Sequence, residues 1–224
     1  MEIETRQKNI LKGYTMLLYF AGSMITYEPS EECIVDFLKN GIVKTLPVSS
    51  SNPNFIKAAS QLRQSCDDTG LCARSLREDF IRLFSRAELK LAPALESLYL
   101  KNPGNEGRHT ESATEFYNSY GWVSKFRGKI HDDHLGVELL FLTRLIDKFL
   151  DLDDKVCRVE MRNEIVRFID DHILSWVGEW NMKVQENAGT STFKGVGTLI
   201  VACAEDLRSF LIEEAQVSHQ PGSC

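Results

Sequence analysis

The sequence predicts an all-α protein, and three observations lead to that prediction. Apolar residues recur at helical spacing in one segment after another, most clearly at positions 135, 139, 142, 146 and 149. No segment shows the alternation of apolar and polar residues between turn residues that is typical of a half-buried strand. With 224 residues, of which 43% are hydrophobic, the chain is long enough to bury a large core without disulfides or metals to stabilise it. We therefore expect residues 1–224 to form a single globular helical domain.

Four helices are expected in the first ninety residues. Pro29 and its acidic neighbours suit a first helical turn, and Asn40-Gly41 provides the glycine that favours a helix end. Asn52-Pro53 is a second such start. The predicted ranges are about 7–23, 29–40, 52–66 and 73–87.

The second half of the chain is predicted to hold four more helices after an irregular segment. Residues 88–109 lack steady periodicity and contain two prolines and two glycines, as functional loops and linkers often do. The predicted helices cover about 110–120, 133–150, 153–181 and 190–214. The third of these is expected to break near His172, and residues 215–224 are expected to form a frayed tail. In the helix over 153–181, the inward side chains are predicted to be Val156, Val159, Ile165, Val166, Ile169, Ile173, Trp176 and Trp180.

The helix over 133–150 is the one around which we expect the others to pack. Its apolar positions almost encircle it, which indicates a largely buried element. Its start is polar: Asp132 or Asp133 is expected to cap the helix, with His134 inside the first turn and Glu138 one turn later on the same face. An Asp-His pair at the mouth of a buried helix is the best candidate for a functional site.

Charge and hydropathy indicate which kinds of partner the protein is expected to bind. The formal net charge of −6 disfavours nucleic acid. Residues 131–171 hold eleven Asp and Glu against six Lys and Arg, so this region favours basic partners. No apolar run reaches membrane-spanning length, and the N-terminus lacks the basic start of a signal peptide. We expect a soluble protein that stays in the cytoplasm.

The six cysteines are scattered through the chain, and no pair has C-x-x-C spacing. Five residues separate Cys66 from Cys72, a spacing that leaves a disulfide or a metal clip open. The simpler interpretation is that all six are free thiols in a reducing compartment.

Six segments of the chain share a further pattern. They are Ile25–Glu32, Leu76–Phe84, Pro93–Leu100, Phe116–Gly121, Ile130–Leu139 and Phe168–Trp176. In residues, order and spacing they resemble the TorD/DmsD/NarJ family, cytoplasmic maturation chaperones of molybdenum-containing oxidoreductases. Asp133-His134 matches the end of the family's E-P-x-D-H motif. The third and sixth segments are similar to its P-x-x-E-S-x-Y and F-x-x-x-H-x-x-x-W motifs.

Two departures from the family pattern bear on the site. Ile130 and His131 replace the Glu and Pro of the main motif, and Ser85-Arg86-Ala87 stands where the family usually has a segment with glycine and proline. Both changes lie near the presumed site. We therefore expect the choice of client to depart from that of the best-known members.

The resemblance implies a TorD-like helical bundle that binds another protein and is not an enzyme, with no cofactor and no metal of its own. Its partners would be the N-terminal leader, often of the twin-arginine type, and the apo catalytic subunit of a molybdopterin-containing oxidoreductase. The chaperone would hold that subunit back from export until its cofactor is inserted. No nucleic acid and no stable membrane insertion are expected. The chain would be a monomer or a domain-swapped dimer.

The candidate peptide-binding site combines an apolar groove with the polar start of the central helix. Its residues are Phe80, Leu83, Phe84, Tyr99, Gly121, Asp133 and His134. The groove would supply affinity, and acidic residues at its lip would select the basic flank of a leader. For Leu83 and Phe84, ordinary core packing explains the apolar spacing equally well. For Asp133 and His134 the alternative is helix capping plus a satisfied polar contact, while His172 and Trp176 are expected to hold helices together.

Two other function classes remain open on sequence alone. In a metal-dependent phosphohydrolase of the all-helical HD type, His109, His131-Asp132 and Asp170 or Asp171 would bind a divalent metal that activates water. His109, however, lies in a glycine-rich loop and not on a predicted helix. The second alternative is a helical scaffold without a peptide groove.

Overall fold

The computed structural model describes residues 2–30, 45–64, 69–85, 91–100 and 112–217. Within these ranges the chain is helical and contains no β-strand, so the predicted all-α class is confirmed. The α-helices are α1 (Glu2–Thr26), α3 (Pro53–Arg63), α4 (Thr69–Phe80), α5 (Ala113–Ser119), α6 (Leu135–Asp151), α7 (Lys155–Ile169), α8 (Val177–Asn187) and α9 (Ser191–Val217). Two π-helical turns, η1 (Ile81–Ser85) and η3 (Asp170–Leu174), and one 3-10 turn, η2 (Glu96–Leu98), complete the described elements.

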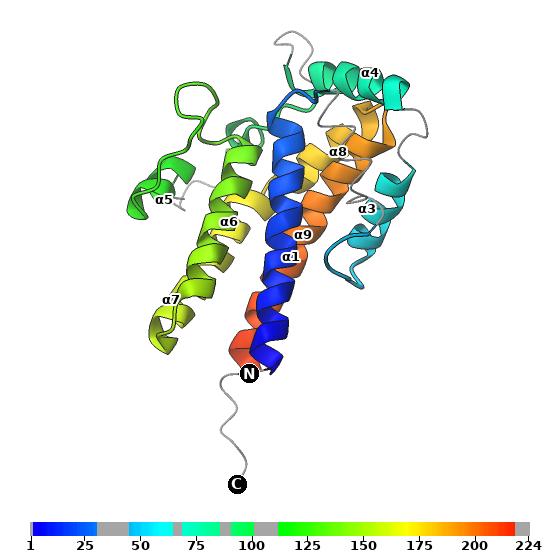
Figure 1. The fold of residues 1–224 in the computed structure, drawn as a ribbon. Helices are drawn as coiled ribbons and strands as arrows, with labels where there is room; N and C mark the ends of the chain where they lie inside the picture. Colours follow the sequence, from blue (N-terminus) through cyan, green and yellow to red (C-terminus); the bar gives the residue numbers. More distant parts are fainter. Residues whose placement is uncertain (1, 31–44, 65–68, 86–90, 101–111, 218–224) are drawn as a thin grey trace.

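The long helices α1 and α9 lie side by side along the middle of the molecule, and the others pack on their flanks (Figure 1). On one flank α6 packs on α1, and α7 packs on α6. On the other flank α3 packs on α9. Helix α4 lies across the end of the bundle where α1 ends and α6 begins (Figure 1). The C-terminal end of α1 and the start of α6 therefore share one end of the molecule with α4.

Helix α6 is the buried element that the sequence predicts. Eleven of its seventeen residues are buried, including the whole of its first turn and a half from Leu135 to Leu139. It crosses α1 closely at Gly136, where an added Cβ would lie 1.9 Å from the Oγ1 atom of Thr26 and 3.1 Å from the carbonyl oxygen of Gly22. Only glycine fits this crossing without displacing α1, so the start of α6 and the end of α1 are held in register.

Most predicted element positions agree with the structure, and the differences have local causes. Asn52 caps α3 and Pro53 opens it, as predicted, and the break near His172 is present as η3 followed by the start of α8. Helix α9 continues through Val217, so residues 215–217 are helical and not frayed. Residues 29 and 30, the expected start of the helix over about 29–40, are not helical, and the rest of that range and the tail from 218 onward lie outside the described residues.

Two predictions about side chains and cysteines are wrong. Val156 and Val159 were expected to face inward, but they are 66% and 36% exposed. Cys72 is disulfide-bonded, so the expectation of free thiols is wrong for this residue. Cys157 and Cys203 are free.

A helix long and apolar enough to cross a membrane does not occur in the described part of the chain.

Candidate functional site

Four segments that are far apart in sequence meet at the end of the bundle where α6 begins. They are the last turn of α1, the α4–η1 junction, residues 93–95 and residues 129–134, and they enclose a cleft of about 300 Å³. Its lining residues are Ile25, Thr26, Phe80, Phe84, Ser85, Pro93, Ala94, Leu95, Lys129, Ile130, His131 and His134. The cleft is therefore mostly apolar, with two imidazoles and one ammonium group at its edge.

Apolar contacts behind the cleft hold its aromatic floor in place. Phe84 packs on Phe80, Trp180 and Phe193, with ring centroids 5.6, 6.4 and 5.5 Å away. Phe80 is 5% exposed and Phe84 is half-buried. The rings are fixed from the core side before any ligand arrives, which lowers the entropy cost of binding.

Residues 94–96 and 133–135 pair as two short antiparallel segments that form one wall of the cleft. The amide of Glu96 donates to the carbonyl oxygen of Asp133 at 3.0 Å, and the amide of Leu135 donates to that of Ala94 at 2.9 Å. The pairing joins two of the six segments on which the family resemblance rests, Pro93–Leu100 and Ile130–Leu139. It fixes the mouth of α6 against the irregular segment before it.

His134, and not an aspartate, caps α6. Its Nδ1 atom accepts a hydrogen bond from the Gly136 amide at 3.1 Å, so a neutral ring carries its proton on Nε2. The carboxylate of Asp133 instead accepts from the Ser97 amide at 3.2 Å. The prediction that Asp132 or Asp133 caps the helix is wrong, because the backbone pairing turns both side chains away from the helix start.

On the far side of the paired segments, side chains of the same motifs hold the helices together. The Nδ1 atom of His172 lies 3.0 Å from a carboxylate oxygen of Glu96, and both side chains are buried. Tyr99 stacks on Trp176 with ring centroids 5.2 Å apart. The expectation that His172 and Trp176 join helices is confirmed by these contacts.

Glu138 lies beside this cluster and has no hydrogen-bond partner among the described residues. It is fully buried, and neither carboxyl oxygen is paired. Burial raises the pKa of Glu138 well above its ordinary value, and the nearby carboxylates of Glu96 and Asp133 raise it further. Glu138 is therefore held as a neutral carboxylic acid. Tyr117 lies close by, and burial likewise raises the pKa of its phenol, with Glu138 as the next cause.

The structure places three of the seven predicted site residues, Phe80, Phe84 and His134, in the cleft lining. The others do not line it. Leu83 is fully buried in the core, and Tyr99 is covered by Trp176 on one face and by the ammonium group of Lys183, 4.4 Å from its ring centroid. Asp133 is part of the wall through its backbone.

Gly121 has a structural role at the end of α5. Its φ of +61° is in the left-handed region, and its amide donates to the carbonyl oxygen of Asn118 at 2.9 Å. The amide of Trp122 donates to that of Tyr117 at 3.0 Å. These two bonds make the glycine-terminated motif that commonly ends helices.

Several cleft residues were not predicted, notably Lys129, Ile130, His131 and the Ile25-Thr26 pair. The signal for Ile130 and His131 was present, because both were identified as departures from the family motif. No Asp or Glu among the described residues lines the cleft, so the expected acidic lip is not found there.

The residues proposed for an HD-type metal site are not gathered. Asp170 forms a hydrogen-bonded ion pair with Arg208, whereas His131 lines the cleft. Within the described ranges no group of three or more His, Cys, Asp or Glu side chains is arranged to hold a metal ion. His109 lies outside those ranges.

The described residues form an all-α fold with an apolar cleft at the start of its central helix. A family model described as nitrate reductase delta subunit matches residues 51–181, more than half of the chain. The chain therefore belongs to the nitrate reductase delta subunit family, whose members are maturation chaperones of molybdoenzymes. The predicted membership in the wider group is confirmed at this level. No curated protein matches the chain.

Proposed function

We propose that this protein binds the N-terminal leader of a molybdoenzyme catalytic subunit and keeps the apo subunit ready for cofactor insertion. The observation that supports the proposal is the open apolar cleft between η1 and residues 129–134. A volume of about 300 Å³ is at the lower end for ligand sites and suits a few apolar side chains of an extended or helical segment. Leaders of the twin-arginine type combine such an apolar run with a basic end.

The charges around the cleft give the bound leader a direction. Lys129 stands at the side of the cleft formed by residues 129–134, so the basic end of a leader is repelled there. The apolar run would occupy the cleft, with the basic end pointing away from Lys129. In this arrangement burial of apolar surface supplies most of the affinity, since exposed ion pairs contribute only about 0–1 kcal/mol each.

The protein acts by binding and not by catalysis, in the cytoplasm, before export or assembly of its client. The family to which the chain belongs supports this role, and the geometry of the cleft supports a polypeptide ligand. The single domain that we propose spans residues 1–224.

The test is a binding measurement with a cleft-blocking substitution. A fluorescein-labelled synthetic peptide with two arginines followed by an apolar run is titrated with the wild-type protein and with Ile130→Asp. Ile130 is half-buried in the cleft lining, so a charge there should weaken binding at least about tenfold by placing an unpaired carboxylate against the apolar run.

Ile56→Asp is the matched control. Ile56 is 58% exposed on α3, away from the cleft, and the same substitution there should leave peptide affinity unchanged. Far-ultraviolet circular dichroism confirms that both variants keep their helices. Equal affinity of the wild-type protein and Ile130→Asp, with both folded, would rule out the cleft as the leader site.

A further inference from the structure

The segment between α5 and α6 brings basic side chains, and no acidic ones, to one edge of the cleft. Residues 119–131 contain Lys125, Arg127 and Lys129 and no Asp or Glu. Lys129 and His131 line the cleft, whereas the ammonium group of Lys125 lies over aromatic rings outside it. Among the described residues of the lining, Lys129 alone therefore carries a permanent charge, and the imidazole of His131 is a hydrogen-bond donor at the same edge.

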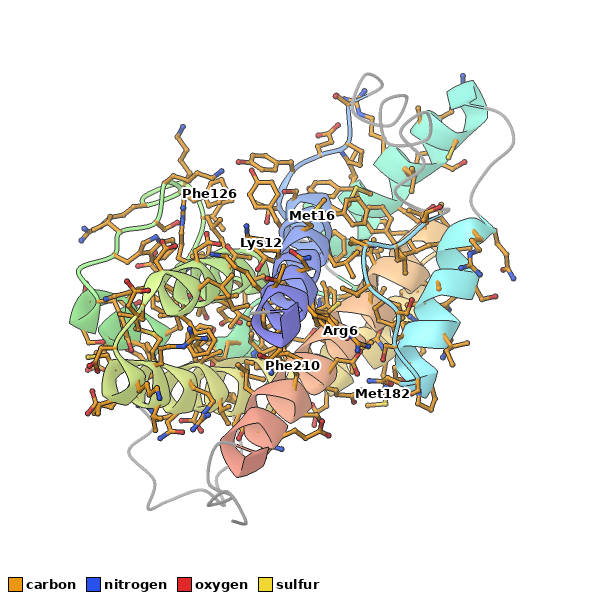
Figure 2. The ribbon with its side chains drawn as sticks, turned by 60° about the horizontal axis from the view of Figure 1, so that its bottom comes forward. Arg6, Lys12, Met16, Phe126, Met182 and Phe210 are labelled. Carbon is orange, nitrogen blue, oxygen red and sulfur yellow. The ribbon has the colours of Figure 1, made fainter. Side chains whose placement is uncertain are left out.

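A buried aromatic ring and a tight turn hold the backbone of Lys129 in place. Figure 2 shows Phe126 on the loop between α5 and α6. Its ring is 9% exposed and packs edge-on against that of Tyr27, with centroids 5.5 Å apart. The carbonyl oxygen of Phe126 accepts from the amides of Lys129 and Ile130 at 2.8 and 3.1 Å, across a turn in which Gly128 has a φ of +80°. Because this backbone is ordered before a ligand arrives, pairing with Lys129 costs less entropy.

The ammonium group of Lys129 has no hydrogen-bond or ion-pair partner among the described residues. The segments that enclose the cleft carry acidic side chains, but the described lining includes none of them: Glu28, Glu78, Asp79, Asp132 and Asp133. All of these except Glu78 accept a hydrogen bond from another group: Glu28 from Arg77, Asp79 from the amides of Gly189 and Thr190, Asp132 from the Thr114 hydroxyl, and Asp133 from the Ser97 amide. The charge of Lys129 is therefore left for a ligand.

Helix α6 adds positive potential on the same side of the cleft. The cleft lies at the N-terminal end of this helix of 17 residues, where the aligned peptide dipoles leave a partial positive charge. Glu138 is the acidic residue of the first turn, but it is buried and held neutral, so it does not offset this charge. The edge formed by residues 129–134 therefore attracts a negatively charged group.

We propose that the leader segment in the cleft carries an Asp or Glu next to its apolar run, and that this carboxylate pairs with Lys129. The inference rests on the proposed leader binding and specifies which leaders fit best. It agrees with the direction that the charges give a bound leader, with the basic end away from Lys129 and the acidic residue toward it. The mostly apolar lining supports a side chain of the leader over a free anion, because a free anion would leave the apolar residues of the cleft uncovered.

Two fluorescein-labelled peptides that differ in one residue test the proposal. Both have two arginines and the same apolar run, followed by Glu in one peptide and by Gln in the other. Fluorescence titration should show that the wild-type protein binds the Glu peptide about two- to fivefold more tightly, as expected for a partly exposed ion pair. This preference should decrease as salt is raised.

Substitutions of Lys129 should change the preference in a graded way. In Lys129→Met, which removes the charge but keeps an apolar stem, the ratio of the two affinities should fall to about one. In Lys129→Glu the ratio should invert, because like charges then meet. A third peptide, with Lys in place of the Glu, should bind Lys129→Glu more tightly than it binds the wild type.

Lys57→Glu is the matched control, because Lys57 is exposed on α3 and does not line the cleft, so the ratio should stay at the wild-type value. Equal affinities of the wild type for the two peptides, with both still weakened by Ile130→Asp, overturn this inference and leave the proposed function standing. A preference that Lys129→Met does not change also overturns it. If neither peptide binds the wild type, the proposed function fails and this inference fails with it.

Calorimetry with inorganic phosphate separates a leader carboxylate from a free anion. Under the proposal, phosphate alone should show no Lys129-dependent binding at millimolar concentration. Phosphate that binds the wild type but not Lys129→Met, together with equal affinities for the Glu and Gln peptides, would assign Lys129 to a free anion and overturn the proposal.

Discussion

On one side of the paired segments 94–96 and 133–135 lies the open cleft, and on the other lies a closed cluster of polar and aromatic side chains. The cleft side is lined mainly by apolar residues and has three cationic or titratable groups at its edge, Lys129, His131 and His134. The closed side contains Glu96 bonded to His172, with Glu138 buried beside them. The pairing of residues 94–96 with 133–135 forms a wall of the cleft, and it also holds Glu96 in the closed cluster.

The two sides differ in which residues of the family motifs they contain. Glu96, Tyr99, His172 and Trp176 recur in the motifs, yet they pack against one another and not into the cleft. Ile130 and His131, where the chain departs from the motif, are in the cleft lining. The motif residues are therefore divided between the two sides: these four form the closed cluster, whereas His134 lines the cleft beside the two departures from the motif.

Removal of His172 should have the largest effect on stability. His172→Ala leaves the buried Glu96 carboxylate without its partner and opens a cavity beside Phe116 and Phe168. We expect the free energy of unfolding to fall by about 3–5 kcal/mol, as for other broken buried pairs. Urea unfolding monitored by circular dichroism measures the loss.

Lys129→Ala provides the comparison from the cleft side. Lys129 is exposed, so its removal should change the free energy of unfolding by no more than about 0.5 kcal/mol. If the two substitutions had similar effects on unfolding, the division into a structural side and a binding side would be incorrect.

Glu138→Gln should make the protein more stable at neutral and alkaline pH. The pKa of Glu138 in the folded state is raised above its ordinary value of 4.5, so above that pH the folded chain holds a proton that the unfolded chain has lost. Stability is therefore highest at low pH and falls as the pH rises toward the folded pKa. The slope is at most about 1.4 kcal/mol per pH unit, and glutamine removes it.

Urea unfolding at pH 5, 6, 7 and 8 checks this dependence. The difference in stability between Glu138→Gln and the wild type should grow with pH, whereas Glu186→Gln, at an exposed position near the end of α8, should follow the wild type. Parallel pH curves for wild type and Glu138→Gln would contradict a neutral buried Glu138. The acidic side chains that interact electrostatically with Glu138 are those of Glu96 and Asp133, and the phenol of Tyr117 also lies close to it.

The sequence was sufficient for the fold class, and it pointed to the start of α6, where the structure has a cleft, because both depend on local patterns. Helical periodicity identified α6 as central, and the Asp-His pair at residues 133–134 located the mouth of the cleft. The detailed roles at that mouth depend on a long-range backbone pairing, which leaves no periodic signal. Within that pairing, His134 caps α6 by accepting from the Gly136 amide, and Asp133 accepts from the Ser97 amide instead.

Long-range packing also decided which aromatic residues face the cleft. Phe80, Leu83 and Phe84 are neighbours on one helical stretch and look alike in sequence. Both Leu83 and Phe84 lie in the π-helical turn from Ile81 to Ser85, yet Phe84 lines the cleft while Leu83 is buried. A π-turn has no residue signature of its own, and helical spacing does not predict it.

Gly121→Ala should have the smallest effect and separates backbone conformation from binding. An added Cβ would meet no atom within 4 Å, but the φ of +61° is unfavourable for alanine, so we expect a loss of about 1 kcal/mol in the free energy of unfolding. Gly178→Ala is the matched control, because its Cβ also meets nothing within 4 Å and its φ is not positive. Alanine is the better helix former there, so Gly178→Ala should raise stability by up to about 1 kcal/mol. Neither Gly121 nor Gly178 lines the cleft, so both variant proteins should bind the leader peptide with the affinity of the wild type. Weaker peptide binding by Gly121→Ala alone would return Gly121 to the binding site that the sequence predicted for it.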